Sequence, residues 1–175
     1  MKKIVLSLLL LFVGCAVAPP AGVAPVKGFD LDRYLGKWYE IARLDHSFER
    51  GLSNVSAIYG AREDGGVKVV NRGYDDRAGV WKQVEGRAYF LGEPSVGSLK
   101  VSFFGPFYGG YHIVALDKVD YSYAMISGPN RDYLWILARE RELPPAILND
   151  LLAQARALGF ATDQLIMVEQ DREDA

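Results

Sequence analysis

The sequence has very little cysteine and histidine, and this scarcity excludes several kinds of site. Of 175 residues, one is a cysteine, Cys15, and two are histidines, His46 and His112. A disulfide needs a second cysteine, and a metal site needs a cluster of ligands that the spacing does not offer. Neither histidine has a nucleophile at a recognisable spacing. We therefore expect no disulfide, no metal, no cofactor and no catalytic residues.

An excess of basic residues and a long apolar run are also missing. Lys and Arg number 20 against 22 Asp and Glu, and no basic cluster stands out, which argues against nucleic acid as a partner. The one conspicuous apolar run, residues 4–13, is shorter than the roughly 20 residues that span a bilayer. Because 50% of the residues are hydrophobic, the chain suits one soluble domain with a substantial core.

The N-terminal segment is typical of a secretory signal. Lys2 and Lys3 precede the apolar run, which ends at Gly14 and Cys15. Residues 11–15 resemble the lipobox of bacterial lipoproteins, although Phe12 stands where the family usually has leucine. The resemblance implies that residues 1–14 are a lipoprotein signal peptide and that Cys15 is the lipid anchor. The alternative is that Cys15 is a free, buried thiol.

Composition divides the rest of the chain. Residues 15–28 are rich in Ala, Pro, Val and Gly without a usable period, which predicts a lipid-anchored flexible tether. Residues 29–170 form the predicted barrel domain, and residues 171–175 form an acidic tail. By resemblance to enterobacterial lipoproteins, the alanine after Cys15 implies sorting to the outer membrane, and we expect the domain to face the periplasm.

Short strand-like runs separated by turn residues fill the chain from Gly36 onward, the pattern of an all-β barrel or sandwich. Asp64-Gly65-Gly66 is a strong hairpin signal because glycine accepts the positive φ that such turns require. The eight predicted strands cover residues 38–45, 54–61, 67–74, 80–91, 99–104, 111–117, 121–127 and 133–139.

One amphipathic helix is predicted near the C-terminus. Pro144 and Pro145 suit its first turn and Gly159 its end. Its apolar stripe must be buried, and we expect it to pack on the outer wall of the sheet. Residues 165–168 then predict a short ninth strand.

Connections between neighbouring strands predict an eight-stranded antiparallel up-and-down barrel, which leaves no edge exposed. Closure brings Arg139, at the end of the eighth strand, close to Trp38 at the start of the first. A guanidinium over an indole contributes roughly 0.5–2 kcal/mol and would close the barrel floor. The turn at residues 117–121 lies at the same end.

The segments that meet there resemble the three sequence signatures of the lipocalins. They are Gly36-Lys37-Trp38-Tyr39, Asp117 with Asp120-Tyr121, and Arg139. Longer strings, residues 36–51, 100–110 and 127–139, resemble the bacterial outer-membrane lipoprotein lipocalins, which are related to apolipoprotein D. This resemblance implies a barrel that binds small apolar ligands, here fatty acids such as palmitate or lysophospholipids, and a homodimer as an assembly.

Strand parity predicts which side chains face inward, because polar residues such as Lys68 and Lys100 should face outward. Parity leaves the face of the sixth strand open, and we expect Tyr111 and Ile113 to face in; the seventh strand has the same ambiguity. The residues leave open whether the interior is a cavity or a filled core, and the resemblance favours a cavity. The predicted ligand-cavity residues are Val67, Val69, Val84, Ala88, Phe90, Leu99, Val101, Phe103, Tyr111 and Ile113.

The loops at the opposite end are the predicted entrance: residues 47–53, 75–79, 105–110 and 128–132. Phe107 and Tyr108 form an aromatic entrance loop, and exposed apolar groups usually indicate a ligand, a partner or a membrane. Three arginines on this rim are candidates for holding an anionic head group. They are Arg50, Arg77 and Arg131. The neighbours Asp45, His46 and Glu49 are interpreted as a charged loop.

The sequence thus predicts a lipid-anchored protein that binds and stores or transports long apolar ligands in the bacterial envelope, without catalysis. Two alternatives stay open. One is a filled barrel that serves as an envelope interaction module or homodimeric scaffold without a physiological small ligand. The other is an envelope enzyme that acts on a lipid or pigment.

Overall fold

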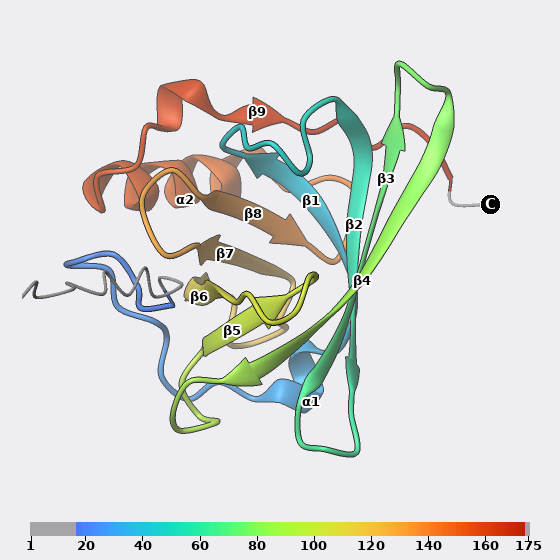
Figure 1. Ribbon diagram of the computed structural model, residues 1–175. Coiled ribbons are helices and arrows are strands. Elements are labelled where there is room, and N and C mark those ends of the chain that lie inside the picture. Colours follow the sequence, from blue (N-terminus) through green and yellow to red (C-terminus); the bar gives the residue numbers. More distant parts are fainter. Residues whose placement is uncertain (1–16, 174–175) are drawn as a thin grey trace, which may run out of the picture.

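The computed structural model describes residues 17–173, and the predicted signal peptide and Cys15 lie outside them (Figure 1). No helix of this part is both long and apolar enough to cross a membrane. A short helix, α1 (Leu31–Tyr34), precedes the sheet, and α2 (Pro145–Ala157), a 3₁₀ turn η1 (Thr162–Gln164) and β9 (Ile166–Met167) follow it. The eight strands between them are β1 (Gly36–Arg43), β2 (Leu52–Ala61), β3 (Val67–Asp75), β4 (Val80–Phe90), β5 (Ser98–Ser102), β6 (Gly109–Leu116), β7 (Tyr123–Ser127) and β8 (Leu134–Ala138).

The eight strands close into an antiparallel barrel because β1 has two partners. Its first half pairs with β2, with Gly36 opposite Tyr59, and its second half pairs with β8, with Arg43 opposite Trp135. All other neighbours in the ring are consecutive along the chain. The predicted up-and-down barrel with one C-terminal helix and a short ninth strand, which pairs with β1, is confirmed.

Tight turns set the strand register. In the β2–β3 hairpin, Gly65 has a φ of 78°, a conformation that suits glycine. The Asp64 carboxylate accepts hydrogen bonds from the Arg62 side chain and the Gly66 N–H. Ala61 and Val67 pair directly below this turn. Because paired residues point to the same face of the sheet, the alternation of inward and outward side chains on β2 matches that on β3.

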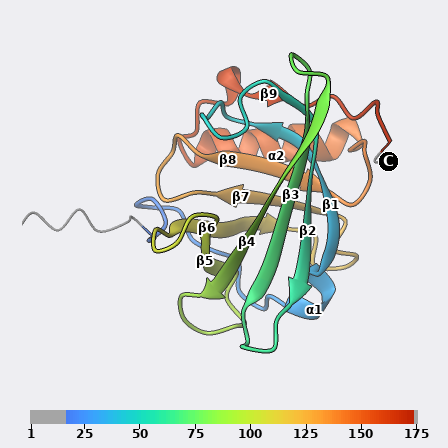
Figure 2. The same ribbon diagram turned by 45° about the vertical axis from the view of Figure 1, so that its right-hand side comes forward.

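The barrel wall separates two apolar cores. The inner core contains Trp38, Val69 and Ile126, whereas the outer core packs α2 against the outer face of β1, β7 and β8 (Figure 2). Met125 lies in the outer core and Ile126 in the inner one. This alternation settles the open question of the seventh strand.

The N-terminal segment lies along the barrel wall. Val23 is buried, and the Val26 N–H donates to the Ile113 carbonyl at 2.8 Å while its carbonyl accepts from Gly97 at 2.9 Å. The sequence predicted a flexible tether over residues 15–28, but the described part, residues 17–28, packs on the domain. Val23 and Val26 bury apolar surface against the domain. Two valines in a segment rich in Ala, Pro and Gly are too few to predict this packing from the sequence.

The described end of the acidic tail is also held. The Gln170 side chain donates to the carbonyls of Glu40 and Val55, at 2.9 and 2.8 Å. The Asn54 side chain bonds the next two residues, donating to the Asp171 carboxylate and accepting from the Arg172 N–H. Residues 170–172 therefore cover the junction of β1 and β2.

Candidate functional site: a cavity inside the barrel

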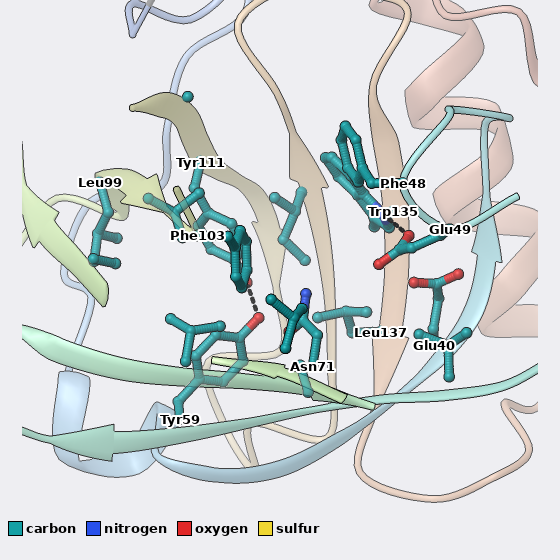
Figure 3. Close-up of a pocket in the computed structure, with 18 of the residues that line it drawn as sticks. Glu40, Phe48, Glu49, Tyr59, Asn71, Leu99, Phe103, Tyr111, Trp135 and Leu137 are labelled. Carbon is teal, nitrogen blue, oxygen red and sulfur yellow. Dashed lines mark hydrogen bonds between the residues drawn. The ribbon is translucent and has the colours of Figure 1, made fainter. Parts of the chain in front are cut away.

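A cavity of about 590 Å³ occupies the upper part of the barrel interior. Pockets for small ligands commonly measure about 300–1,000 Å³ and are mostly apolar. Residues of all eight barrel strands line it, and most of their side chains are aliphatic or aromatic (Figure 3). The barrel interior is therefore hollow near the mouth and filled with side chains near Trp38 and Arg139. The sequence had left open whether the interior is a cavity or a filled core, and the structure shows a cavity.

Trp38 and Arg139 form the floor. The guanidinium carbon of Arg139 lies 4.0 Å from the centre of the completely buried Trp38 ring. The same guanidinium donates to three backbone carbonyls, those of Lys37 at 2.9 Å, Arg33 at 2.7 Å and Tyr121 at 3.3 Å. One side chain thus ties together the start of β1, the end of α1 and the turn before β7.

The turn at residues 117–121 completes this end. The Asp117 carboxylate accepts from the N–H groups of Val119, Asp120 and Ser122 and from the Ser122 hydroxyl. These hydrogen bonds outweigh its partial burial, so the pKa of Asp117 is lowered. Tyr121 is buried with a φ of 56°, whereas Asp120 lies exposed and contributes only its backbone N–H to the turn.

Phenylalanines surround the mouth. Phe48, Phe104 and Phe107 line the cavity and are nevertheless 62%, 75% and 67% exposed. Tyr133 stacks on Phe48 with ring centres 6.0 Å apart. The mouth is therefore apolar at the point where a ligand would enter.

Three tyrosine hydroxyls form a chain at the lower end of the cavity. The Tyr111 hydroxyl lies 2.7 Å from that of Tyr34. It also lies 2.8 Å from that of Tyr59 (Figure 3). Burial raises the pKa of all three phenols. They stay neutral and satisfy one another, so this end offers little free hydrogen-bonding capacity.

Two buried carboxylates interrupt the apolar wall on the β1 side. Glu40 Oε1 accepts from Arg43 at 2.7 Å, and Glu49 Oε2 accepts from the Trp135 indole at 3.0 Å. His46 Nε2 lies 2.9 Å from the same Glu49 oxygen. Glu40, Glu49 and Trp135 lie with Phe48 on the cavity wall (Figure 3), whereas Arg43 and His46 lie behind it.

The two carboxyls differ in their electrostatics. Burial, and then the neighbouring Glu49 charge, raise the pKa of Glu40 well above its ordinary value. Burial would also raise the pKa of Glu49, but bonds from His46 and Trp135 and the charge of Arg43 hold it below its usual range. Glu40 thus favours the protonated form beside an ionised Glu49.

Eight of the ten predicted lining residues lie on the cavity wall. Alternation on the strands places them there, since outward neighbours such as Lys68 and Glu85 form an ion pair with their Nζ and Oε2 2.9 Å apart. Tyr111 also faces the cavity. The eight are Val67, Val69, Val84, Ala88, Leu99, Val101, Phe103 and Tyr111.

Three predictions of position need correction. Phe90 and Ile113 do not line the cavity but pack in the filled lower part. Phe29, from the segment before α1, packs edge-on to Phe90, with ring centres 6.1 Å apart, and itself lines the cavity above. Tyr108 turns to the outer face, where Tyr89 and Lys100 contact its ring; only Phe107 of the entrance pair lines the cavity.

The rim arginines serve other contacts. Arg50 pairs with Asp45 at 2.8 Å, and Arg131 donates to the carbonyls of Leu158 and Ala21, both at 2.7 Å. Arg77 lies exposed in the β3–β4 turn. None of the three lines the cavity, so the geometry gives no support to an anion site built from them.

The histidines are buried within the protein. The His112 side chain bonds the Ser98 hydroxyl at 3.0 Å through Nδ1, and burial lowers the pKa of His112; neither residue lines the cavity. Residues 17–173 hold no group of three or more His, Cys, Asp or Glu side chains placed to bind a metal ion.

Sequence reasoning missed the polar part of the wall. His46 and Glu49 were interpreted as a charged loop, yet both are buried. Glu40 carried a usable signal, because it lies two residues after the inward-facing Trp38 and shares its face. Glu49 carried none, since its loop has no period.

Comparisons with known proteins agree with this architecture. A family model described as a lipocalin-like domain matches residues 29–170. The outer membrane lipoprotein Blc of Vibrio cholerae is 51% identical over 170 residues, covering 97% of this chain and 99% of that one. Blc of Escherichia coli is 52% identical, covering 91% and 90%, and bovine apolipoprotein D is 36% identical, covering 72% and 70%.

A solved structure with little sequence identity shares the fold. Insecticyanin of the tobacco hornworm Manduca sexta superimposes with a TM-score of 0.70 at 22% identity, covering 89% of each chain. The outer-membrane lipoproteins among the close relatives give the same location to this protein, which is lipid-anchored at the outer membrane. With the family model matching most of its length, the chain belongs to the lipocalin family.

Proposed function

We propose that this lipocalin binds fatty acids, lysophospholipids or similar single-chain lipids in its cavity and stores or transports them on the periplasmic side of the outer membrane. The observation that carries the proposal is the apolar cavity of about 590 Å³, which opens between the exposed phenylalanines of the mouth. Cys15 would hold the domain at the membrane through its acyl chains.

Transfer free energies make this binding strong enough without specific chemistry. An acyl chain with a dozen or more CH₂ groups gains about 10 kcal/mol on burial, at about 0.8 kcal/mol per group. Ordering and association cost several kcal/mol of that gain. Affinities from submicromolar to micromolar follow.

We expect encapsulation and no bond chemistry. The polar groups of the cavity lining are carboxyls, phenols, two amides, one serine hydroxyl, the indole of Trp135 and the cationic side chains of Arg72 and Lys82. The one histidine near the lining, His46, points at Glu49 and is packed among aromatic rings. A serine or cysteine nucleophile beside a free base is absent from the described lining.

The exposed apolar side chains of the mouth favour one further candidate, a homodimer that pairs this face of two copies. Phe104 and Phe107 would then be buried by the partner. Native mass spectrometry of the gently purified protein reports the subunit count and any lipid that copurifies.

Titration of a fluorescent fatty acid into the delipidated protein tests the main proposal. Saturable binding is expected, with displacement by unlabelled single-chain lipids. Fluorescence that rises without saturation, as it does with non-specific partition, would contradict it.

A further inference from the structure

The mouth of the cavity presents large aromatic side chains to the outside. Phe104 and Phe107, in the loop between β5 and β6, are 75% and 67% exposed, and Phe48 on the opposite rim is 62% exposed. These three are the exposed phenylalanines of residues 17–173, and all of them lie at this end of the barrel. Exposed apolar side chains that gather at one place usually indicate a surface for a partner or a membrane.

The N-terminal segment begins at the same end of the barrel. Val17 lies against the start of β6, where a Cβ added to Gly110 would lie 2.8 Å from the Val17 carbonyl oxygen. The residues that follow are held in place, because Arg131 donates to the Ala21 carbonyl at 2.7 Å and Val23 is buried. Figure 2 shows this start of the described chain, in blue, beside β6. The segment therefore fixes the point from which the chain leads back to its anchor.

The length of chain between Val17 and Cys15 limits how far the barrel can stand from the membrane. Two residues span at most about 7 Å. The protein is lipid-anchored at the outer membrane, and acyl chains on Cys15 would enter the leaflet within this distance of Val17. The end of the barrel with the exposed phenylalanines is thus held at the leaflet, and the floor at residues 117–121 points away from it.

A polar groove beside the same loop suits the head-group region of a bilayer. The groove measures about 320 Å³, and Arg87, Ser102 and Gly105 are among its lining residues. The Ser102 hydroxyl is buried and has no hydrogen-bond partner in the described part of the chain. Arg62 and Glu85 also line the groove, but both already form ion pairs. A guanidinium and a free hydroxyl can both donate to phosphate oxygens.

We propose that the mouth of the barrel docks on the phospholipid leaflet that holds the lipid anchor. Phe104 and Phe107 insert among the acyl chains, while Arg87 and Ser102 bind the phosphate of a neighbouring head group. The inference rests on the proposed function, because it takes Cys15 as the acylated residue. In this orientation a single-chain lipid passes between the leaflet and the cavity without crossing water.

A fluorophore on an introduced cysteine tests the depth of single positions. Cys15 is the one cysteine of the chain, and acylation consumes its thiol. Phe107→Cys is labelled with nitrobenzoxadiazole in the lipidated protein, in vesicles of phosphatidylethanolamine and phosphatidylglycerol that contain a doxyl-labelled quencher lipid. Val119→Cys is the control, because Val119 is 77% exposed in the floor turn. We expect quenching and a blue-shifted emission at position 107 and neither at position 119.

A second measurement uses a Cys15→Ser form, which cannot be acylated, and follows its flotation with the same vesicles. The double substitution Phe104→Ser and Phe107→Ser should lower its partition into the vesicles at least about tenfold, because it removes most of the apolar area that inserts. Arg87→Gln should lower the partition severalfold. Val119→Ser is the matched control and should leave the partition unchanged.

Several results would overturn the docking. Equal quenching at positions 107 and 119, or none at 107, would do so, and so would equal partition of the double variant and its control. A probe at 107 that is blue-shifted without vesicles, in a protein that sediments as a dimer and is not quenched by the labelled lipid, would assign this face to a second copy of the chain. If Phe107→Cys does not fold, as judged by circular dichroism, Phe104→Cys takes its place.

The outcomes also separate the docking from the proposed function. If mass spectrometry finds no acyl chain on Cys15, the anchor of the proposed function fails, and the partition of the form with Cys15→Ser decides the docking by itself. If the protein does not bind a fluorescent fatty acid, lipid binding in the cavity fails, and the quenching at position 107 still decides whether the mouth meets the leaflet.

Discussion

Replacing Arg139 by alanine should destabilise the whole barrel, because this side chain joins segments that are far apart in the sequence. Its guanidinium covers the Trp38 ring at 4.0 Å and donates to the carbonyls of Lys37, Arg33 and Tyr121. Alanine would remove all four contacts and open the barrel floor to water.

The contacts set the size of the effect. Each lost hydrogen bond costs about 1 kcal/mol net, since the partly exposed carbonyls regain water, and the cation–π contact contributes about 0.5–2 kcal/mol. We therefore expect a loss of about 3.5–5 kcal/mol, a large fraction of the 5–15 kcal/mol typical of a domain. Arg139→Lys keeps the charge but not the fork of donors, and it should recover about a third of that loss.

Urea denaturation followed by tryptophan fluorescence measures this loss. With an m-value of about 2 kcal/mol/M, the urea midpoint of Arg139→Ala should fall by about 1.8–2.5 M. Arg141→Ala is the control, because Arg141 lies 5.5 Å from the Tyr39 ring and makes one bond to the Arg172 carbonyl; it should cost about 0.5 kcal/mol. Equal midpoints for the two variants would refute the assignment of Arg139 as the main tie of the floor.

Three further predictions concern the cavity, the buried carboxyl and the first turn of the barrel. Phe103→Asp places a charge on the cavity wall and should weaken fatty acid binding at least about tenfold. Val119→Asp, at an exposed position of the floor turn that does not line the cavity, should not; equal affinities of the two variants would contradict the assignment of Phe103 to the cavity lining. Because burial raises the pKa of Glu40, the stability that its protonated form provides is complete below the ordinary glutamate value of about 4.3 and is lost as pH rises through the raised value. The free energy of unfolding of Glu40→Gln, measured by urea denaturation, should therefore rise relative to that of the unmodified protein as pH increases. If the two free energies depend on pH in the same way, Glu40 does not titrate in this range. Gly36→Ala should cost about 1–2 kcal/mol, because Gly36 has a φ of 94° and the added Cβ would lie 3.4 Å from Arg139 Nη1, whereas Gly92→Ala, with open space around it, should be nearly neutral in the same assay.

The barrel and its floor could be predicted because both follow from local patterns. Alternation fixes the inward face of a strand, and short turns such as the one at Asp64 force neighbouring strands to pair. Closure of an even number of strands then brings Arg139 to Trp38, whatever the loops do. These features need no knowledge of how side chains pack.

The polar wall and the edges of the cavity could not be predicted in the same way. The register of β1 shifts between Glu40 and Ala42, so alternation cannot be continued through it to the next loop. The loop that buries Glu49 has no period, and the same holds for the segment that places Phe29 under the cavity. The boundary between the filled core and the cavity depends on how this loop and this segment pack.

The N-terminal segment illustrates the same limit. Its composition is that of a linker, yet Val23 is buried and Val26 forms backbone hydrogen bonds with the barrel. Packing of a short irregular segment depends on the shape of the surface that receives it, which the segment's own sequence does not contain.

A crystal structure of the protein grown with a long single-chain lipid tests the central claim most directly. The account predicts continuous density for a hydrocarbon tail that runs from the mouth beside Phe107 to the tyrosines above the floor, in contact with Leu99 and Val69. A barrel interior filled by its own side chains, with no channel wide enough for the tail, would contradict it.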